Sequence, residues 1–199
     1  MLIPTSGATC DIVVRKSRFI GISVPVTSQE AARESISEAR QVYPDASHVV
    51  HSYILGPKGD IFSFSDDREP KNTAGRPVLE VLKGSGITNI LVLVIRYFGG
   101  TKLGTGGLVH AYSGAAKEVL RLTPVEPMIE TCEFSVLLAY EHYEQVKKAL
   151  IDYHARDITE SFETSVFLSG TIPKEHAETA ARQVSDLTAG RSFLSTPKP

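Results

Sequence analysis

The chain has 199 residues, of which 42% are hydrophobic and 22% charged, a balance typical of a globular protein with one large domain or two small ones. This composition excludes a disordered chain, a collagen-like repeat and a coiled coil. The 21 basic and 23 acidic side chains give a formal net charge of −2, so no global positive field draws the chain to nucleic acid or to a membrane.

The segments that would direct a protein to a membrane or out of the cell are not recognisable. The longest purely aliphatic run, 90–95, has six residues, far fewer than the roughly 20 that span a bilayer. The first ten residues lack the basic and apolar regions of a signal peptide. Cys10 and Cys132 are too few for a disulfide framework and lack metal-ligand spacing. We therefore expect a soluble, cytoplasmic protein with no membrane partner.

Strands and helices alternate along the first 122 residues. Apolar spacing, turn residues and caps predict strands at 10–14, 18–24, 48–55, 61–65 and 87–96, and helices at 28–42, 77–83 and about 105–122. The helix at 77–83 is expected to begin at Pro77 and to end before Gly84. Residues 87–96 are apolar without alternation, which indicates a strand covered on both faces or lying in the middle of a sheet.

A domain boundary is expected at 123–127, where two prolines interrupt the periodicity. Beyond it the pattern predicts strands at 132–139, 156–163, 165–172 and 191–195, and helices at 141–153 and 174–189. This β-α-β-β-α-β order is that of a ferredoxin-like sandwich. The predicted fold is therefore α+β, with domains at 1–127 and 128–199.

Charge is divided unevenly between the two halves. Residues 1–130 hold 14 basic and 13 acidic side chains, a net charge of +1, and the remaining residues hold 7 and 10, a net charge of −3. Any site for a polyanion must therefore be local, and the first domain is the more plausible place for it.

Glycine is concentrated between a predicted buried strand and a predicted helix. Five of the nine residues from Gly99 to Gly107 are glycine, which permits close approach of the backbone to a ligand. The free N–H groups of the helix start at 106–108 favour an anion, such as phosphate or sulfate. The alternative is that these glycines only let the helix pack tightly on the sheet. The spacing fits neither a P-loop nor a dinucleotide-binding fingerprint, so no cofactor is predicted.

Asp66, Asp67 and Glu69 form the one tight acidic cluster, at the end of a predicted strand. Three carboxylates suit Mg²⁺ or acid–base chemistry. The interleaved Arg68 and Lys71 favour the other interpretation, in which these carboxylates cap backbone N–H groups or form local ion pairs. No complete catalytic set and no metal site can be assembled from the sequence.

Four strings carry a resemblance to a known family: KSRFI (16–20), YPDASH (43–48), FSDDREPKNTAGRP (64–77) and RYFGGTKLGTGGLVHAY (96–112). They resemble the IMPACT/YigZ family, although Arg68 and Asn72 stand where the family usually has glycine. The resemblance implies a first domain similar to the second domain of ribosomal protein S5, with a mixed sheet and helices on one face. It also implies a ferredoxin-like second domain similar to domain V of elongation factor G.

The resemblance further implies a role in translation, because eukaryotic relatives regulate the amino-acid-starvation kinase by competing for its activator. We expect a binding protein that contacts RNA, the ribosome or a translation-related protein through the glycine-rich face. The alternatives are an enzyme that holds a small phosphate-containing substrate at the glycine-rich loop, and an adaptor that docks proteins on the second domain. The residues expected to bind nucleic acid or an anion are Arg96, Tyr97, Phe98, Gly99, Gly100, Lys102, Gly104, Gly106, Gly107, Lys71, Thr73 and Arg76.

Overall fold

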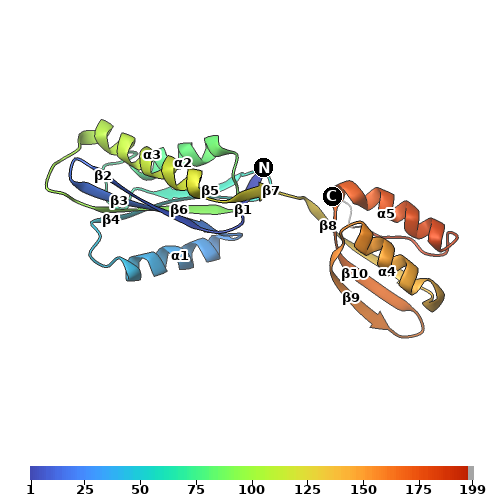
Figure 1. Ribbon diagram of the computed structural model, residues 1–199. Helices are drawn as coiled ribbons and strands as arrows, with labels where there is room; N and C mark the ends of the chain where they lie inside the picture. The colour runs from blue at the N-terminus through green and yellow to red at the C-terminus, as the bar shows by residue number, and fades with distance from the viewer. Residues whose placement is uncertain (197–199) are drawn as a thin grey trace. The chain divides into compact units, whose positions relative to one another are not determined.

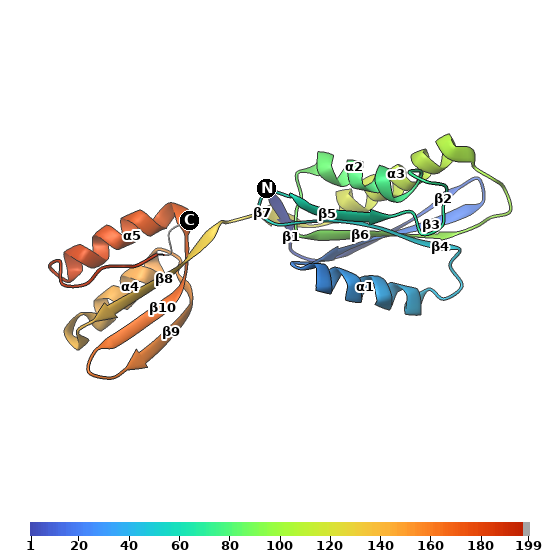
Figure 2. The ribbon, with the colours of Figure 1, turned by 180° about the vertical axis from the view of Figure 1, so that it is seen from behind.

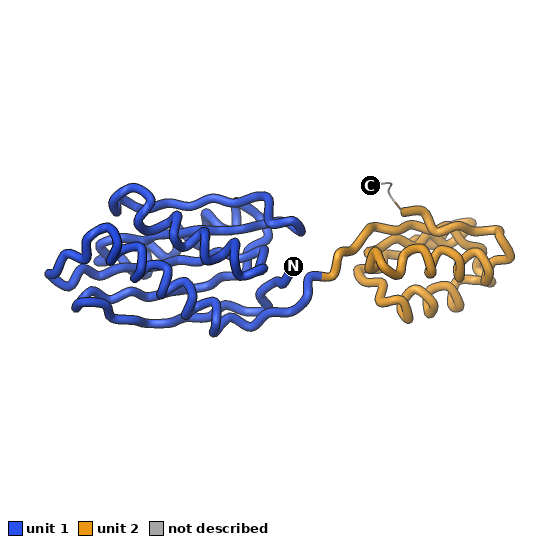
Figure 3. The backbone as a smooth tube through the Cα atoms, turned by 90° about the horizontal axis from the view of Figure 1, so that it is seen from above, with its two compact units in different colours: residues 1–128 blue, residues 129–199 orange. Residues whose placement is uncertain are grey.

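The computed structural model describes residues 1–196 and divides into two compact units (Figure 3). The first unit runs from Met1 to Met128, and the second begins at Ile129. This division lies one residue beyond the expected boundary. Within the described residues, no helix is both long and apolar enough to cross a membrane.

The first unit is built on a five-stranded sheet in the order β2-β3-β6-β4-β5 (Figure 1). Its strands are β2 (Ala8–Val14), β3 (Ser17–Pro25), β4 (His48–Leu55), β5 (Ile61–Ser65) and β6 (Ile90–Tyr97). Its helices are α1 (Gln29–Val42), α2 (Gly75–Ser85) and α3 (Gly104–Leu122). The α+β class is confirmed.

Two finer expectations for this unit are wrong. All four strand pairings of the sheet are antiparallel, so the sheet is not mixed. The reason is that β6 inserts between β3 and β4, so these two strands, which run in the same direction, are not neighbours. The helices also lie on both faces, with α1 on one and α2 and α3 on the other (Figures 1 and 2).

Burial of β6 follows from this layering. The apolar side chains of α2 and α3 share one core with Val92 and Val94, and those of α1 share another with Leu91 and Leu93. A strand with a helix layer on each face needs apolar residues at every position. The prediction of a strand covered on both faces is therefore confirmed.

Smaller differences concern the ends of elements. α2 begins two residues before Pro77, which is tolerated in the first turn because its missing N–H has no partner there. The helix continues past Gly84 and ends at Gly86, whose φ of 72° is left-handed. The segment around the expected boundary is not a loop, because β7 (Val125–Pro127) pairs with β1 (Leu2–Pro4), a strand that the sequence did not indicate.

The second unit has the order of elements expected of a ferredoxin-like sandwich. Its strands are β8 (Thr131–Leu138), β9 (Arg156–Phe162) and β10 (Val166–Pro173), and its helices are η1 (Tyr140–His142), α4 (Tyr143–Asp152) and α5 (Lys174–Leu187). The sheet has the order β8-β10-β9. The strand predicted at 191–195 is reduced to one bridge between Ser195 and Ser135, at the outer edge of β8.

Candidate nucleic-acid interface

Four segments that are distant in sequence meet at one end of the first unit's sheet: the β2–β3 turn (15–16) and the loops 44–47, 66–74 and 98–103. We call this region the loop end. The strand register brings them together, because His48 at the start of β4 lies opposite Arg96 at the end of β6. Hydrogen bonds then join the loops: the Phe98 N–H donates to Ser47 Oγ at 3.1 Å, and the Gly99 N–H donates to Ser17 Oγ at 3.2 Å.

The glycines of the loop end differ in what they do. A Cβ on Gly99 would lie 1.9 Å from the Lys16 carbonyl oxygen, so only glycine fits against the β2–β3 turn. Gly104 begins α3 with a φ of 74°, which is left-handed. Gly106, in contrast, has open space where its Cβ would be and a regular helical position. Packing therefore explains Gly99, and the backbone turn explains Gly104, but neither explains Gly106.

The three carboxylates of the acidic cluster have separate partners. Asp66 accepts hydrogen bonds from the N–H groups of Asn72, Ala74 and Gly75, and so caps the start of α2. Asp67 accepts from the Val49 N–H at 2.6 Å and from Arg40 at 2.8 Å. The interpretation of these residues as caps and local ion pairs agrees with this geometry. Among residues 1–196, no group of three His, Cys, Asp or Glu side chains is placed to hold a metal ion.

Glu69 is the centre of a buried polar cluster. Its Oε1 accepts hydrogen bonds from Arg96 Nη1 at 2.6 Å and from the Tyr112 hydroxyl at 2.7 Å, and His48 Nε2 lies 3.6 Å away. Burial and the hydrogen bond to Glu69 raise the pKa of Tyr112 above its usual range, so its phenol stays protonated and donates.

Arg96, one of the residues expected to bind nucleic acid or an anion, lies inside the protein and not on its surface. The residue is only 5% exposed, and its guanidinium carbon lies 5.5 Å from the ring centres of both Phe19 and Phe98. Its charge is taken up by Glu69, which the sequence pattern could not pair with it across 27 residues. Arg96 is a structural cation of the loop end.

A cavity of about 390 Å³ opens beside the first turn of α3. Its lining comes from three segments: Glu69, Pro70, Arg96, Phe98, Lys102, Leu103, Gly104, Thr105 and Leu108. No side chain caps the start of α3, and its first turn holds no acidic residue. The N–H groups of this helix start therefore have their partial positive charge at the cavity.

Five exposed cations surround this end of the sheet and have no carboxylate within salt-bridge distance in the described part of the chain: Arg15, Lys16, Arg68, Lys71 and Lys102. Asp45 and Asp66 are the carboxylates of the loop end without a cationic partner among residues 1–196. Five cations against two carboxylates leave an excess of three positive charges, which the small net charge of the unit conceals.

The other residues expected to bind nucleic acid or an anion differ in their exposure and in their position. Phe98 is 50% exposed, whereas Tyr97 is half-buried with the Arg18 guanidinium 6.0 Å from its ring centre. Thr73 is buried and donates its hydroxyl to the Pro70 carbonyl at 2.6 Å. Gly100 and Gly107 lie in the loop before α3 and in its first turn.

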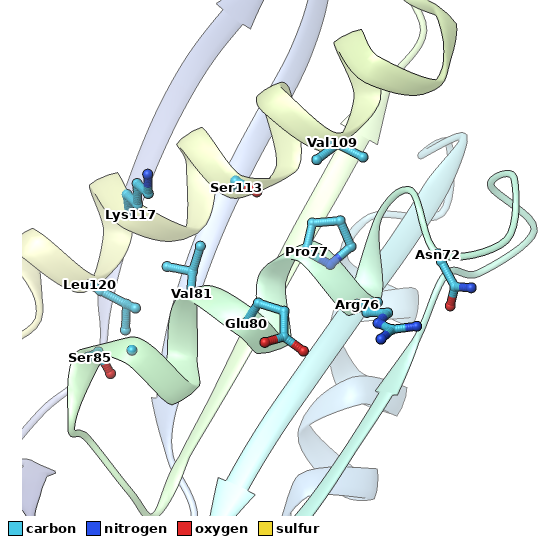
Figure 4. Close-up of a pocket in the computed structure, with 11 residues that line it drawn as sticks. Asn72, Arg76, Pro77, Glu80, Val81, Ser85, Val109, Ser113, Lys117 and Leu120 are labelled. Carbon is cyan, nitrogen blue, oxygen red and sulfur yellow. The ribbon is translucent and has the colours of Figure 1, made fainter.

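Arg76 lies at a different hollow. A groove of about 750 Å³ runs between α2 and α3, with Pro77, Val81, Val109 and Leu120 among its apolar lining residues (Figure 4). Arg76, Glu80 and Lys117 supply its charged side chains. Because this groove and the cavity share no lining residue, Arg76 does not belong to the cavity.

Three contributors to the loop end were missed by the sequence analysis: Arg15, Lys16 and Tyr112. The connection 15–17 between the strands predicted at 10–14 and 18–24 is short enough for a hairpin, and this would have marked the basic pair 15–16 as an exposed turn. Tyr112 was recognised only as a residue of the apolar helix face, because its spacing is the same whether or not its hydroxyl has a partner.

Comparisons with known proteins agree over most of the chain. The model of the Impact N-terminal domain matches residues 15–120. An IMPACT family member from Thermus thermophilus is 35% identical over 92% of this chain and 99% of its own length. The IMPACT family member YigZ of Escherichia coli is 32% identical over 95% of this chain and 94% of its own length.

A solved structure extends the similarity to the fold of both units. A crystal structure described as that of a hypothetical protein is 31% identical, covers 99% of this chain and 97% of its own, and superposes with a TM-score of 0.78. The family model and the relatives both identify the same family over most of the chain. The chain therefore belongs to the IMPACT family.

Proposed function

We propose that this protein binds RNA in the context of translation, and that the loop end of its first unit is the binding surface. The observation that carries the proposal is the convergence of five exposed cations, from three separate segments, with an excess of three positive charges. Phosphate contacts supply most of the affinity of proteins for nucleic acids, and they require cations that are not already paired.

Two further features of the loop end suit RNA. The uncapped start of α3 offers backbone N–H groups to a phosphate. The exposed ring of Phe98 offers a surface on which an unpaired base can stack. Buried Arg96 supports this ring from within the protein, at 5.5 Å from its centre.

The link to translation comes from the family. The family resembles domains of a ribosomal protein and of an elongation factor, which act in translation. Its eukaryotic relatives are regulators of translation. This chain is also 32% identical over 122 residues to the IMPACT homologue of Schizosaccharomyces pombe, and the match covers 58% of this chain and 42% of that protein. Ribosomal RNA is accordingly the target that we expect.

The test is binding of a labelled structured RNA, followed by fluorescence anisotropy over a salt series, together with co-sedimentation with ribosomes. Because each phosphate contact releases counterions, replacing Arg15, Lys16, Lys71 or Lys102 singly by alanine should weaken binding and lower the salt slope by about 1. Lys58→Ala is the matched control, since Lys58 is an exposed lysine in the β4–β5 turn, at the opposite end of the sheet.

Two outcomes would contradict the proposal. One is the absence of salt-dependent binding to RNA or ribosomes even at low salt. The other is an equal loss of affinity in Lys58→Ala, which would mean that charge anywhere on the unit suffices. Retention on ribosomes that does not depend on salt or on these cations would instead indicate a protein partner.

A further inference from the structure

We propose that the cavity beside the first turn of α3 binds one unpaired nucleotide of the RNA, with its phosphate at the helix start and its base against Phe98. This inference rests on the proposed function, since it names the unit of RNA that the loop end receives. The cavity volume of about 390 Å³ lies within the range of about 300–1,000 Å³ found for small-ligand sites.

One residue that lines this cavity has a buried polar atom without a partner. Arg96 is 5% exposed, and its Nε has no hydrogen-bond partner among the described residues. Buried polar atoms in native proteins are nearly always hydrogen-bonded, so a bound molecule with an acceptor oxygen is expected to supply the missing partner. The hydrogen bonds from Arg96 and Tyr112 to Glu69 both go to Oε1, so Oε2 is also available to a ligand.

The available oxygen of Glu69, Oε2, indicates one part of the ligand. Because Oε2 can only accept, the ligand must present an N–H or O–H donor to it. A nucleotide carries both kinds, on its base and on its ribose. The negative charge of Glu69 does not repel the ligand's phosphate strongly, because Arg96 neutralises it at 2.6 Å.

The residues at the start of α3 indicate the second part of the ligand, a phosphate. Thr105 contributes an exposed hydroxyl in the first turn of α3, and Lys102 contributes an exposed ammonium group just before it. A Cβ on Gly106 would meet no other atom within 4 Å, so packing does not require glycine at this position. The absence of a side chain leaves the backbone N–H groups of this turn open to close approach by a ligand. Amides, a hydroxyl and a cation together form a site for phosphate.

Phe98 completes the cavity with an aromatic wall that is 50% exposed. An aromatic ring stacks on any base, but a base in a double helix is already stacked and paired. The nucleotide that enters the cavity is therefore one from a loop, a bulge or a single strand.

The experiment titrates the full-length protein with the four 5′-ribonucleotides, the matching nucleosides, 2′-deoxynucleotides and inorganic phosphate, with isothermal calorimetry as the readout. Phe98→Ala should weaken nucleotide binding by about 5- to 150-fold, whereas Phe98→Tyr keeps the ring and the affinity. Both changes are at an exposed side chain, so the fold is retained.

A second pair of variants tests the phosphate end. Thr105→Glu places a carboxylate where the helix dipole favours it, so the helix remains stable while the phosphate is repelled. We expect at least about tenfold weaker nucleotide binding in this variant. Thr105→Gln is the uncharged variant of the same size. It loses the threonine hydroxyl but adds no negative charge, so it should bind nucleotides more weakly than the unchanged protein and more tightly than Thr105→Glu.

Tighter binding of nucleotides than of nucleosides and of inorganic phosphate, lost in Phe98→Ala and in Thr105→Glu, would support the inference. Weaker binding of deoxynucleotides would then identify a ribose hydroxyl as the donor to Glu69, and a preference among bases would identify a base N–H. Inorganic phosphate that binds as tightly as nucleotides would overturn the inference, and so would no binding at about 10 mM nucleotide.

The two proposals fail separately. If structured RNA still binds with its full salt slope in Phe98→Ala and Thr105→Glu, the proposed function stands and the nucleotide cavity is wrong. If nucleotides bind and both variants abolish this binding, but no RNA is bound at low salt, the cavity stands and the RNA-binding function is wrong.

Discussion

At the scale of single residues, the ion pair between Arg96 and Glu69 holds the loop end together. It links the end of β6 to the loop 66–74, and the Tyr112 hydroxyl extends it to α3. Removing one member of a buried pair is far more costly than the pair is worth, because the other member is left charged and unpartnered. Arg96, one of the residues expected to bind nucleic acid or an anion, therefore stabilises the loop end through its pair with Glu69.

Arg96→Ala should lower the free energy of unfolding by about 3–5 kcal/mol, since it leaves Glu69 buried without its cation. Urea denaturation at pH 7, followed by circular dichroism, measures this loss. Lys102→Ala, which removes an exposed cation from the same end of the sheet, should change stability by less than about 0.5 kcal/mol. Equal effects of the two changes would show that Arg96 is not paired as described.

Asp67 should make stability depend on pH. Burial acts to raise the pKa of this carboxyl, but the hydrogen bonds from the Val49 N–H and from Arg40 outweigh it and hold the pKa below its usual value of 3.8. Because the folded-state pKa is the lower one, the stabilisation is present above about pH 4 and is lost as the pH falls through the folded-state pKa.

Asp67→Asn should therefore be less stable than the unchanged protein at pH 7, and this difference should shrink below about pH 4. Urea midpoints measured between about pH 2.5 and 7 provide the comparison. Asp45→Asn is the control, because Asp45 is exposed and no cation lies within salt-bridge distance of it among residues 1–196. A difference that stays constant with pH would contradict the role given to Asp67.

At the scale of elements, the junction between β6 and α3 contains two glycines, Gly99 and Gly106, with contrasting surroundings. Gly99 lies where the chain presses against the β2–β3 turn, and Gly106 lies in a helix turn with nothing in front of it. Glycine in a regular helical position costs stability relative to alanine, so its presence at 106 without a packing reason favours a role in binding.

Gly99→Ala and Gly106→Ala should accordingly have opposite effects. The first forces a Cβ to 1.9 Å from the Lys16 carbonyl and should lower the melting temperature, since the turn must move. The second should stabilise the unit by up to about 1 kcal/mol and weaken RNA binding. Thermal melts and anisotropy measure both; Gly106→Ala with unchanged RNA affinity would exclude close approach of RNA to this turn.

At the scale of the whole molecule, the chain consists of two units with separate cores. The clusters around Val92 and Leu91 contain residues of the first unit alone, and the cluster around Leu150 contains residues of the second alone. The excess of positive charge belongs to the loop end of the first unit. We therefore expect binding of RNA and folding of the second unit to be separable properties.

Leu150→Ala tests this separation. Leu150 is fully buried in the second unit, so its truncation should cost about 2–5 kcal/mol there. Scanning calorimetry should show one transition shifted to lower temperature and the other unchanged, with RNA affinity preserved at 25 °C. A common shift of all transitions would mean that the two units unfold as one.

Local patterns were enough to predict most elements of the fold. Apolar periodicity, caps and turn residues predicted the strands and helices of the five-stranded sheet, and the absence of alternation in β6 indicated burial on both faces. The motifs at 64–77 and 96–112 likewise led to the family. These signals are determined by residues that are close in sequence, because backbone geometry repeats every two residues in a strand and every 3.6 in a helix.

Which charged side chains are paired with an opposite charge, and which are not, is apparent only from the tertiary structure. Arg96 and Lys102 are both cations of one glycine-rich segment, yet the first is buried against Glu69 and the second is exposed. The order of the strands is also visible only in the tertiary structure, where β6 lies between β3 and β4 and α1 lies on the face opposite α2 and α3. Pairing of charges and of strands depends on contacts across long stretches of chain, and no local pattern contains that information.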